Sequence, residues 1–251
     1  MKKYFVAANW KMNLSQVQTI NLAQQLVAQV NNDQVEVILC PTFTALAAVS
    51  EILSQSSLSL GSQDVFWEQR GAFTGEISAE QLKELGVTYT IVGHSERRQH
   101  LTETDLMVHQ KVKASLAQNL KPIICVGETF EQRQDSQQDY VIIKQVTAAL
   151  AGLEIKPEDQ IIVAYEPVWV IGTGQAVLPE QANHIAKVIR QTLVDLFPLV
   201  QVKNNFRIIY GGSVDQNNAV GFLAEEVITG FLVGGASLSA EKFLPLINQL
   251  V

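Results

Sequence analysis

Short runs of apolar residues recur along the whole chain and alternate with more polar segments. Eight of these runs are rich in β-branched residues and begin at positions 5, 35, 58, 88, 122, 161, 206 and 227, where the chain reads FVAAN, VEVILC, LSLGS, TYTIVG, PIICVG, IIVAY, FRIIYGG and VITGFLVGG. Their length and composition predict β-strands. Because the runs are apolar almost throughout, both faces of the sheet should be covered, as in parallel α/β folds.

Segments with helical spacing lie between these runs. Their apolar positions include Val17, Ile20, Val27 and Val30 near the amino terminus, and Ile185, Ile189 and Leu196 further along. Helix starts are predicted by capping-box spacing at Ser15 with Gln18 and at Ser78 with Gln81, and by Pro179 at a first turn. Pro245 lies inside the last helical segment, and we expect it to shorten or bend that helix.

Strands and helices alternate to the end of the chain. The 251 residues divide into eight strand–helix units of about 31 residues, and no linker or composition shift marks a second domain. We therefore predict one α/β domain over residues 1–251. Eight units favour a closed (β/α)8 barrel over an open doubly wound sheet.

Composition and charge argue against two classes of partner, nucleic acids and membranes. The 18 basic residues are scattered among 25 acidic ones, for a net charge of −7, so no nucleic-acid partner is expected. No apolar run reaches membrane-spanning length and the first residues do not form a signal peptide, so no membrane partner is expected. Cys40 and Cys125 lie in apolar stretches without metal-ligand spacing, and we interpret them as reduced core thiols of a cytoplasmic protein.

Polar residues and glycines follow several of the predicted strands. They are Asn9 and Lys11 after the first strand, His94 and Ser95 after the fourth, Glu166 after the sixth, Ser213 after the seventh, and Gly234 and Gly235 after the eighth. In a barrel of parallel strands these strand ends share one face. Residues more than two hundred positions apart in the chain should therefore meet at one mouth.

Three of these side chains suit the movement of a proton next to a carbonyl group. The carboxylate of Glu166 can act as a general base, a neutral His94 can polarise the carbonyl, and Lys11 can offset negative charge on oxygen. Each residue alone also has an ordinary interpretation, as an ion-pair partner, a structural histidine or a surface lysine.

The residues around these candidates have structural interpretations. The histidines predicted to have no chemical role are His100, His109 and His184. Arg97 and Arg98 are expected to hold their loop through ion pairs with residues such as Glu103. Trp10 and Met12, on either side of Lys11, indicate a packed loop.

Two glycine-rich segments, YGGSV at 210–214 and LVGGAS at 232–237, expose backbone N–H groups. The second leads directly into a predicted helix, and the loops after the last two strands of a barrel often bind phosphate. Tight turns are the alternative interpretation. The chain has no GxxxxGK[ST] motif, and GTGQAV lacks the third small residue of a dinucleotide fingerprint, so nucleotide binding is poorly supported.

Seven motifs, in order along the chain, resemble those of the triosephosphate isomerase family. They are NWKMN at 9–13, GAFTGE at 71–76, GHSERR at 93–98, CVGET at 125–129, YEPVW with IGTG at 165–174, YGGSV at 210–214 and GFLVGGASL at 230–238. The resemblance implies a TIM barrel that interconverts dihydroxyacetone phosphate and D-glyceraldehyde 3-phosphate through an enediolate. It implies no metal and no organic cofactor.

The resemblance also implies a role for each candidate. Glu166 would move the proton between two carbons, His94 would hydrogen-bond the substrate oxygens, and Lys11 with Asn9 would bind the substrate and stabilise the enediolate. The backbone amides implied for the phosphate are those of Gly172, Ser213, Gly234 and Gly235. Ser95 and Glu96 would support the site, with the Glu96 carboxylate near the lysine.

Two larger expectations follow from the resemblance. Residues 167–174 would form a lid that excludes water, with Pro167, Val168 and Trp169 as its stiff hinge. The segment DVFWEQRGAFTGE would pair two copies of the chain in a homodimer, in which Thr74 approaches the neighbouring copy's site. Packing of the aromatic residues of this segment on their own barrel is the alternative.

A few positions depart from the family pattern. Val170 and the pair Gln175-Ala176 change the lid, and Ala8 and Leu14 replace glycines. Thr229 stands where an aspartate is common, so an ion pair to the preceding helix would be missing. None of these changes removes a chemical group.

Two other functions stay open from the sequence. The first is another barrel enzyme acting on sugar phosphates, although a Schiff-base aldolase would need a lysine at a strand end, and the sixth strand ends at Glu166 instead. The second is a non-catalytic phosphosugar-binding barrel, which would be expected to lack one of Lys11, His94 or Glu166.

Overall fold

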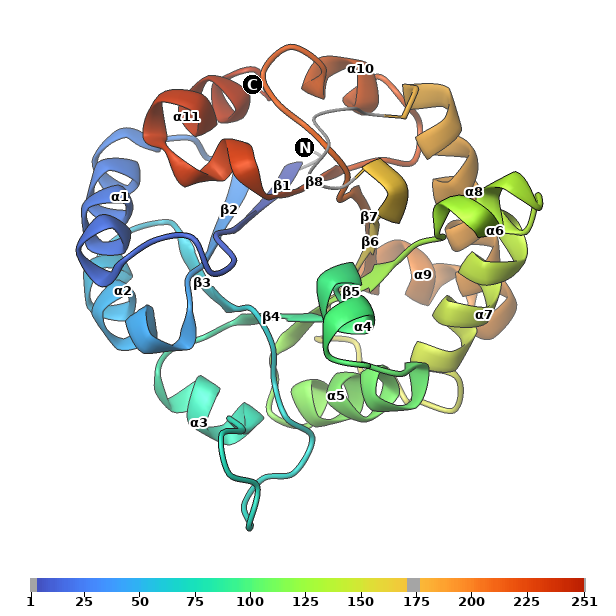
Figure 1. Ribbon diagram of the computed structural model, residues 1–251, viewed down its shortest axis with the longest axis horizontal. Coiled ribbons are helices and arrows are strands. Elements are labelled where there is room, and N and C mark those ends of the chain that lie inside the picture. Colours follow the sequence, from blue (N-terminus) through green and yellow to red (C-terminus); the bar gives the residue numbers. More distant parts are fainter. Residues whose placement is uncertain (1–3, 171–176, 251) are drawn as a thin grey trace.

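The computed structural model describes residues 4–170 and 177–250, which form one closed barrel of parallel strands surrounded by helices (Figure 1). Each strand pairs with the next one in the sequence, and the last pairs with the first. The strands are β1 (Tyr4–Asn9), β2 (Val35–Cys40), β3 (Ser59–Ser62), β4 (Tyr89–Val92), β5 (Lys121–Val126), β6 (Ile161–Tyr165), β7 (Phe206–Tyr210) and β8 (Gly230–Val233). The predicted (β/α)8 barrel is confirmed.

Helices cover the outside of the barrel and fill the connections (Figure 1). They are α1 (Gln16–Gln29), α2 (Leu46–Leu53), α3 (Ala79–Glu84), α4 (Ser95–His100), α5 (Asp105–Ala117), α6 (Phe130–Gln134), α7 (Gln138–Leu150), α8 (Pro179–Leu196), α9 (Leu199–Asn205), α10 (Ala219–Leu223) and α11 (Ala240–Asn248). Short 3₁₀ turns are η1 (Phe43–Ala45), η2 (Val168–Val170) and η3 (Gly235–Leu238). Within the described ranges, no helix is both long enough and apolar enough to cross a bilayer.

Both faces of the strands are buried, as the unbroken apolar runs predict. Side chains that point into the barrel form a closed inner cluster of Phe5, Ala7, Ile38, Cys40, Tyr89, Ile91, Ile123, Cys125, Ile162, Ala164, Ile209 and Leu232. The alternate residues of the strands pack against the helices in a larger outer core. Every residue of β6 is buried, so the strand that leads to Glu166 is fixed on both faces.

The predicted helix starts are confirmed. Capping boxes at Ser15 and Ser78 begin α1 and α3, and Pro179 is the first residue of α8. Pro245 does not end α11, which continues to Asn248, so the expected shortening is not seen.

The apolar spacing noted near the amino terminus matches the buried side of α1 only in part, because Val30 is buried and Val27 packs against the core. Val17 is 68% exposed, and the residues that face the barrel are Thr19, Leu22, Ala23 and Leu26. Burial of Leu22 and Leu26 against the barrel leaves Val17, in the first turn of α1, on the exposed side.

One strand starts later than its apolar run. Residues 225–229 form the bend and short loop that lead into β8, with the N–H of Thr229 donating to the carbonyl of Ile208 at 2.9 Å. Arg190 of α8 pairs instead with Glu226 at 3.4 Å, so this helix has an ion pair to the same bend even though position 229 is not an acid.

Candidate active site

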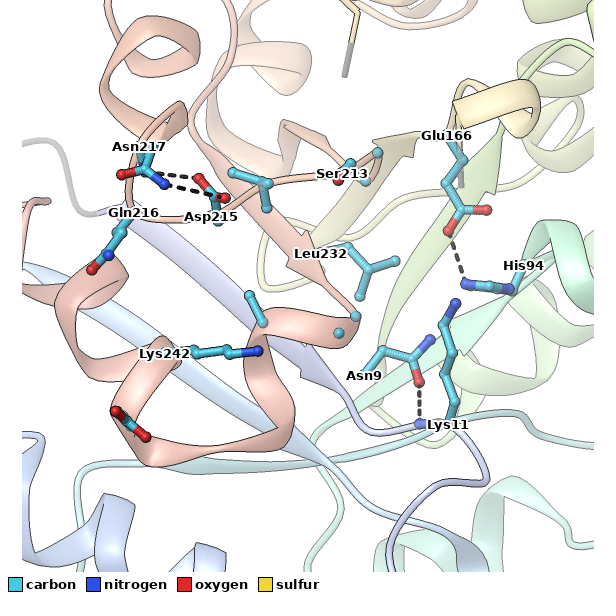
Figure 2. Close-up of a pocket in the computed structure, with 17 residues that line it drawn as sticks. Asn9, Lys11, His94, Glu166, Ser213, Asp215, Gln216, Asn217, Leu232 and Lys242 are labelled. Carbon is cyan, nitrogen blue, oxygen red and sulfur yellow. Dashed lines mark hydrogen bonds and ion pairs between the residues drawn. The ribbon is translucent and has the colours of Figure 1, made fainter. Parts of the chain in front are cut away.

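A cavity of about 650 Å³ opens at the carboxyl ends of the strands (Figure 2). The side chains and glycines predicted from the sequence meet there although they come from five different strand ends. Those that line the cavity are Asn9, Lys11, His94, Glu166, Ser213, Gly234 and Gly235. The convergence expected from the barrel geometry is therefore present in the structure.

Glu166 follows β6 directly and is only 1% exposed. Its Oε2 accepts a hydrogen bond from the backbone N–H of Ser95 at 2.9 Å. Its Oε1 lies 3.2 Å from Nε2 of His94 (Figure 2), but this contact lacks hydrogen-bond geometry, and Oε1 has no hydrogen-bond partner among the described residues. An unpaired oxygen in a buried carboxylate is costly. Its position in the cavity suits an atom that accepts a proton from a ligand.

Two glycines on the neighbouring strands make room for Glu166. A Cβ atom at Gly127 would lie 1.7 Å from the carbonyl oxygen of Glu166, and one at Gly211 would lie 2.9 Å from its Cγ. The backbone N–H of Glu166 donates to the carbonyl of Val126 at 2.8 Å. The position of the carboxylate thus depends on the absence of side chains on both sides of it.

His94 precedes α4 and is almost fully buried. Its Nδ1 accepts a hydrogen bond from the backbone N–H of Glu96 at 3.2 Å. Because Nδ1 acts as an acceptor, the proton of the neutral ring is on Nε2, which faces Glu166. The imidazole can therefore donate one hydrogen bond to a ligand in the cavity.

Lys11 has a backbone φ of 51°, in the left-handed region that residues other than glycine rarely adopt. Its N–H donates to Oδ1 of Asn9 at 3.1 Å, and its carbonyl accepts from Nε2 of Gln63 at 2.9 Å. Its Nζ pairs with Oε1 of Glu96 at 2.5 Å. Strain of this kind persists only where neighbouring groups hold it, and here it fixes an ammonium group beside the cavity.

The loop around Lys11 is only partly packed. Trp10 is 1% exposed, as predicted, but Met12 is 93% exposed, so the expectation for this residue is wrong. Trp10 faces the core that α1 covers, whereas Met12 follows the left-handed residue and points to solvent.

The glycines after β8 leave open space. A Cβ at Gly234 would lie 3.5 Å from Cε of Lys11, and one at Gly235 would meet nothing within 4 Å. Packing within the protein therefore does not require a glycine at 235. The short turn η3 begins at this residue, so its free N–H groups border a volume that a small anion can fill.

Glu128 is a part of the site that the sequence did not reveal. It is fully buried after β5, and its Oε1 accepts hydrogen bonds from the Tyr165 hydroxyl and from Nε1 of Trp169, both at 3.0 Å. Arg133 of α6 pairs with the same oxygen at 3.1 Å and stacks over the Trp169 ring. Glu128 thus holds the segment that follows Glu166. Its place in the CVGET motif was the only available signal.

A buried charge network lies behind His94; its members are Asp64, Arg97, Glu103 and Lys111. Lys111 is 1% exposed and donates to Asp64 at 2.7 Å and to Glu103 at 2.9 Å. Arg97 pairs with Glu103 at 2.5 Å and with Asp64 at 2.7 Å, which confirms the predicted role of this arginine. Oε1 of Glu103 accepts from the N–H of Gly93, so the network holds the loop that carries His94.

The network shifts the pKa values of its two acids in opposite directions. Burial alone would raise the pKa of Glu103, but Lys111 and Arg97 outweigh it, and the pKa lies below its usual range. The pKa of Asp64 is raised, chiefly by burial and further by the charge of Glu103. Arg98 lies outside this network and pairs with Asp105 at 2.6 Å.

Both cysteines are free and buried inside the barrel, as predicted. Burial raises the pKa of the Cys125 thiol well above its usual range, and the nearby negative charge of Glu166 raises it further. The pKa of Cys40 is raised by burial. Neither thiol is therefore activated as a nucleophile.

Some sequence candidates lie away from the cavity. Thr74 is exposed in the loop between β3 and α3, which projects from the barrel (Figure 1). Gly172 and the pair Gln175-Ala176 lie outside the described residues. Of the other histidines, His109 contacts the carbonyl of Ala149 and His184 pairs with Asp139, both away from the site. In the described part of the chain, no group of three or more His, Cys, Asp or Glu is arranged to hold a metal ion.

The chain is similar to known proteins over nearly its whole length. The chain matches the family model described as triosephosphate isomerase over residues 4–250. It is 46% identical over 248 residues to the triosephosphate isomerase of Alkaliphilus metalliredigens and 44% identical over 248 residues to that of Caldanaerobacter subterraneus subsp. tengcongensis. Each alignment covers 99% of this chain and 100% of the relative.

Proposed function

The chain belongs to the triosephosphate isomerase family and interconverts dihydroxyacetone phosphate and D-glyceraldehyde 3-phosphate, and we propose that Glu166, His94 and Lys11 carry out this reaction. Ketose and aldose have the same composition, so the reaction only relocates protons and electron pairs. The observation that carries the proposal is the buried Oε1 of Glu166, which has no hydrogen-bond partner among the described residues and faces the cavity beside the Nε2–H of His94.

Glu166 is the base in this proposal. Its carboxylate removes a proton from the hydroxymethyl carbon of dihydroxyacetone phosphate, the C–H electron pair forms a carbon–carbon double bond, and the carbonyl electrons move to oxygen. The carboxylic acid then returns the proton to the neighbouring carbon, so Glu166 ends the cycle ionised. One proton must also pass from the hydroxyl oxygen to the former carbonyl oxygen, and His94 has the donor position to assist it.

Lys11 and Asn9 stabilise the enediolate between these two steps. The ammonium group of Lys11 offsets the negative charge on oxygen, and the amide of Asn9 adds a hydrogen-bond donor. Because Glu96 pairs with Nζ of Lys11, it keeps the ammonium group in place while the site is empty. Ser95 positions the base in a similar way, because its backbone N–H donates to Oε2 of Glu166.

The phosphate binds at the glycine loops in this proposal. The open volume at Gly235, the adjacent Gly234 and the loop that carries Ser213 together border one side of the cavity. Gly172 is proposed as a fourth contact from the resemblance alone. Backbone N–H groups suit a phosphate dianion because they donate hydrogen bonds without adding a mobile side chain.

Residues 167–174 act as a lid in this proposal, with Pro167, Val168 and Trp169 as the hinge. The contacts of Trp169 with Glu128 and Arg133 would hold this hinge in the described conformation and must change when the lid closes. Exclusion of water would protect the enediolate from losing its phosphate.

A homodimer is the proposed assembly. Met12, Phe73 and Leu101 are large apolar side chains with 93%, 42% and 59% exposure. Phe66 packs on Trp67 and on Phe73 with ring centroids 4.1 and 4.8 Å apart, so the aromatic residues stiffen the projecting loop that carries Thr74. Pairing of two copies would remove exposed apolar side chains such as these from water. Light scattering coupled to gel filtration tests it, and a monomer mass at micromolar concentration would contradict it.

The reaction belongs to glycolysis and, in the opposite direction, to gluconeogenesis. We expect the chain to work in the cytoplasm as one domain over residues 1–251, because two free buried thiols suit a reducing compartment. Cell fractionation would test the location.

Exchange with solvent tests the chemistry. Purified protein is incubated with dihydroxyacetone phosphate in D₂O, and deuterium at the reacting carbons of both triose phosphates is followed by NMR. Proton transfer through Glu166 predicts deuterium in substrate and product, because the carboxylic acid exchanges with solvent before it returns the proton. Binding of the ligand without any exchange would instead indicate the non-catalytic phosphosugar-binding barrel.

A further inference from the structure

Lys242 lines the cavity but has no part in the reaction described above. It is the third residue of α11 and extends toward the interior of the cavity from the side of β8 (Figure 2). The first turn of a helix carries the positive end of its dipole, so a lysine there is disfavoured. Lys242 is exposed at the edge of the cavity, so its ammonium group is available to an anionic ligand that enters.

The charges around the cavity leave Lys242 without an anionic partner. The described residues that line the cavity include three carboxylates, Glu166, Asp215 and Glu241, and two lysines, Lys11 and Lys242. Lys11 is paired with Glu96. Within residues 4–170 and 177–250, no acidic side chain forms an ion pair with Lys242.

Asp215 does not compete for the ammonium group of Lys242. Its Oδ1 accepts from the N–H of Asn217 at 2.7 Å, and its Oδ2 faces the amide of the same side chain at 3.5 Å (Figure 2). These bonds turn the carboxylate toward its own loop. Lys242 is therefore the one lining cation in the described chain that is free to meet an incoming anion.

We propose that Lys242 is a further substrate-binding residue, whose ammonium group attracts the phosphate dianion of the triose phosphate toward the amides of Gly234 and Gly235. The net charge of −7 repels an anion from the molecule as a whole, so attraction must be local. This inference rests on the proposed phosphate site at the two glycines. It adds a side-chain cation at the outer edge of that site.

Charge-changing variants at Lys242 test the inference, with Lys144→Gln as the matched control. Lys144 is exposed on α7 and does not line the cavity, so its substitution changes net charge equally without changing the site. Attraction across several ångströms of water predicts that Lys242→Gln lowers kcat/KM for glyceraldehyde 3-phosphate about three- to tenfold at low ionic strength. The loss should shrink to less than about twofold at a few tenths molar salt, while Lys242→Arg and Lys144→Gln stay near the parent.

Two probes separate this inference from the proposals it rests on. Inorganic phosphate, used as a competitive inhibitor, should bind about three- to tenfold more weakly to Lys242→Gln. Glyceraldehyde without a phosphate should be turned over equally by parent and variant.

If the parent binds inorganic phosphate and Lys242→Gln matches Lys144→Gln with every ligand, the role of Lys242 is overturned and the phosphate site stands. If the parent does not bind inorganic phosphate, the phosphate site itself is wrong and the inference falls with it. A loss that is equal in Lys242→Gln and Lys242→Arg and insensitive to salt would show a structural role and overturn the inference.

Discussion

Two buried glutamates hold the same short loop and have opposite surroundings. Glu103 accepts from the N–H of Gly93, and Glu166 accepts from the N–H of Ser95, two residues further on. The second oxygen of Glu103 meets both Lys111 and Arg97, whereas the second oxygen of Glu166 has no hydrogen-bond partner in the described structure. One acid is fully paired, and the other keeps an acceptor unused.

The different partners of the two carboxylates suit different tasks, structural for Glu103 and chemical, as proposed above, for Glu166. A paired, buried charge fixes the loop and is costly to disturb, because its partners would be left uncompensated. An unused acceptor in a cavity lowers stability but can take a proton. Since both carboxylates are buried, burial alone does not distinguish the structural role of Glu103 from the catalytic role proposed for Glu166. The partners of each oxygen atom do.

The largest expected effect is on turnover at the unpaired acid. Glu166→Gln keeps the size and shape of the side chain but cannot accept the proton, so kcat should fall by about two to four orders of magnitude. Its free energy of unfolding should stay within about 1 kcal/mol of the parent, because Oε1 has no hydrogen bond to lose within residues 4–170 and 177–250. Steady-state kinetics and urea unfolding measure the two quantities. A variant within tenfold of the parent would remove Glu166 from the mechanism.

The same substitution at the paired acid should affect mainly stability. Glu103→Gln leaves Lys111 and Arg97 with only Asp64, and breaking a buried pair costs about 3–5 kcal/mol of unfolding free energy at pH 7. Turnover per folded molecule should fall much less than in Glu166→Gln. Urea unfolding of this variant is compared with that of Glu154→Gln, an exposed glutamate whose substitution should leave stability unchanged.

The difference in unfolding free energy between Glu103→Gln and the parent should become smaller at acid pH. The pKa of Glu103 is lower in the folded chain than its ordinary value of 4.5, so its contribution is present above pH 4.5 and is lost as pH falls through the folded pKa. Asp64 acts in the opposite direction, because its pKa is raised. The unfolding free energies of parent and variant should therefore differ most near pH 7 and converge below about pH 4.5. A difference independent of pH would contradict the charge network as its source.

A smaller effect is expected on substrate binding when a side chain is added at Gly235. Gly235→Ala places a methyl group that meets nothing within 4 Å, so folding should not suffer. The methyl group would occupy the space proposed for phosphate, and KM should rise about tenfold, the order expected from loss of one or two charge-assisted hydrogen bonds. Kinetics with both triose phosphates measure this. An unchanged KM would place the phosphate elsewhere.

The smallest effect is expected at Ser95. Its hydroxyl is buried without a hydrogen-bond partner in the described structure, and its backbone N–H, which holds Glu166, remains in Ser95→Ala. Turnover should fall less than about tenfold and stability should change by less than about 1 kcal/mol. A much larger loss of activity would show that the hydroxyl contacts Glu166 or substrate during the reaction.

Local patterns predicted most of the fold. The eight apolar runs became the eight strands, and the capping boxes at Ser15 and Ser78 began helices, because these signals act over a few residues. The exposure of Val17 in α1 was not predictable, because the side that a helix buries depends on what it packs against, which local spacing does not contain. Pro245 stayed inside α11, where packing of its neighbours outweighs the lost hydrogen bond.

The candidate site was predictable where residues follow strand ends. Barrel geometry alone brings Lys11, His94 and Glu166 together. Contacts between distant side chains were not predictable: Gln63 holds Lys11 from 52 positions away, and Lys111 reaches Asp64 across 47. The direction of the Lys242 side chain, toward the cavity, was equally unpredictable from the sequence, because it depends on the rotation of α11 about its axis.

Both native thiols lie inside the barrel, and the sequence contains no others. A cysteine introduced at an exposed position such as Glu131, beside the ring contact of Phe130 with Trp169, would be the sole accessible attachment point for a fluorescent dye. Quenching by the indole could then test for the proposed hinge movement in single molecules. The isomerase is thus ready for site-specific labelling without any prior removal of its own sulfur groups.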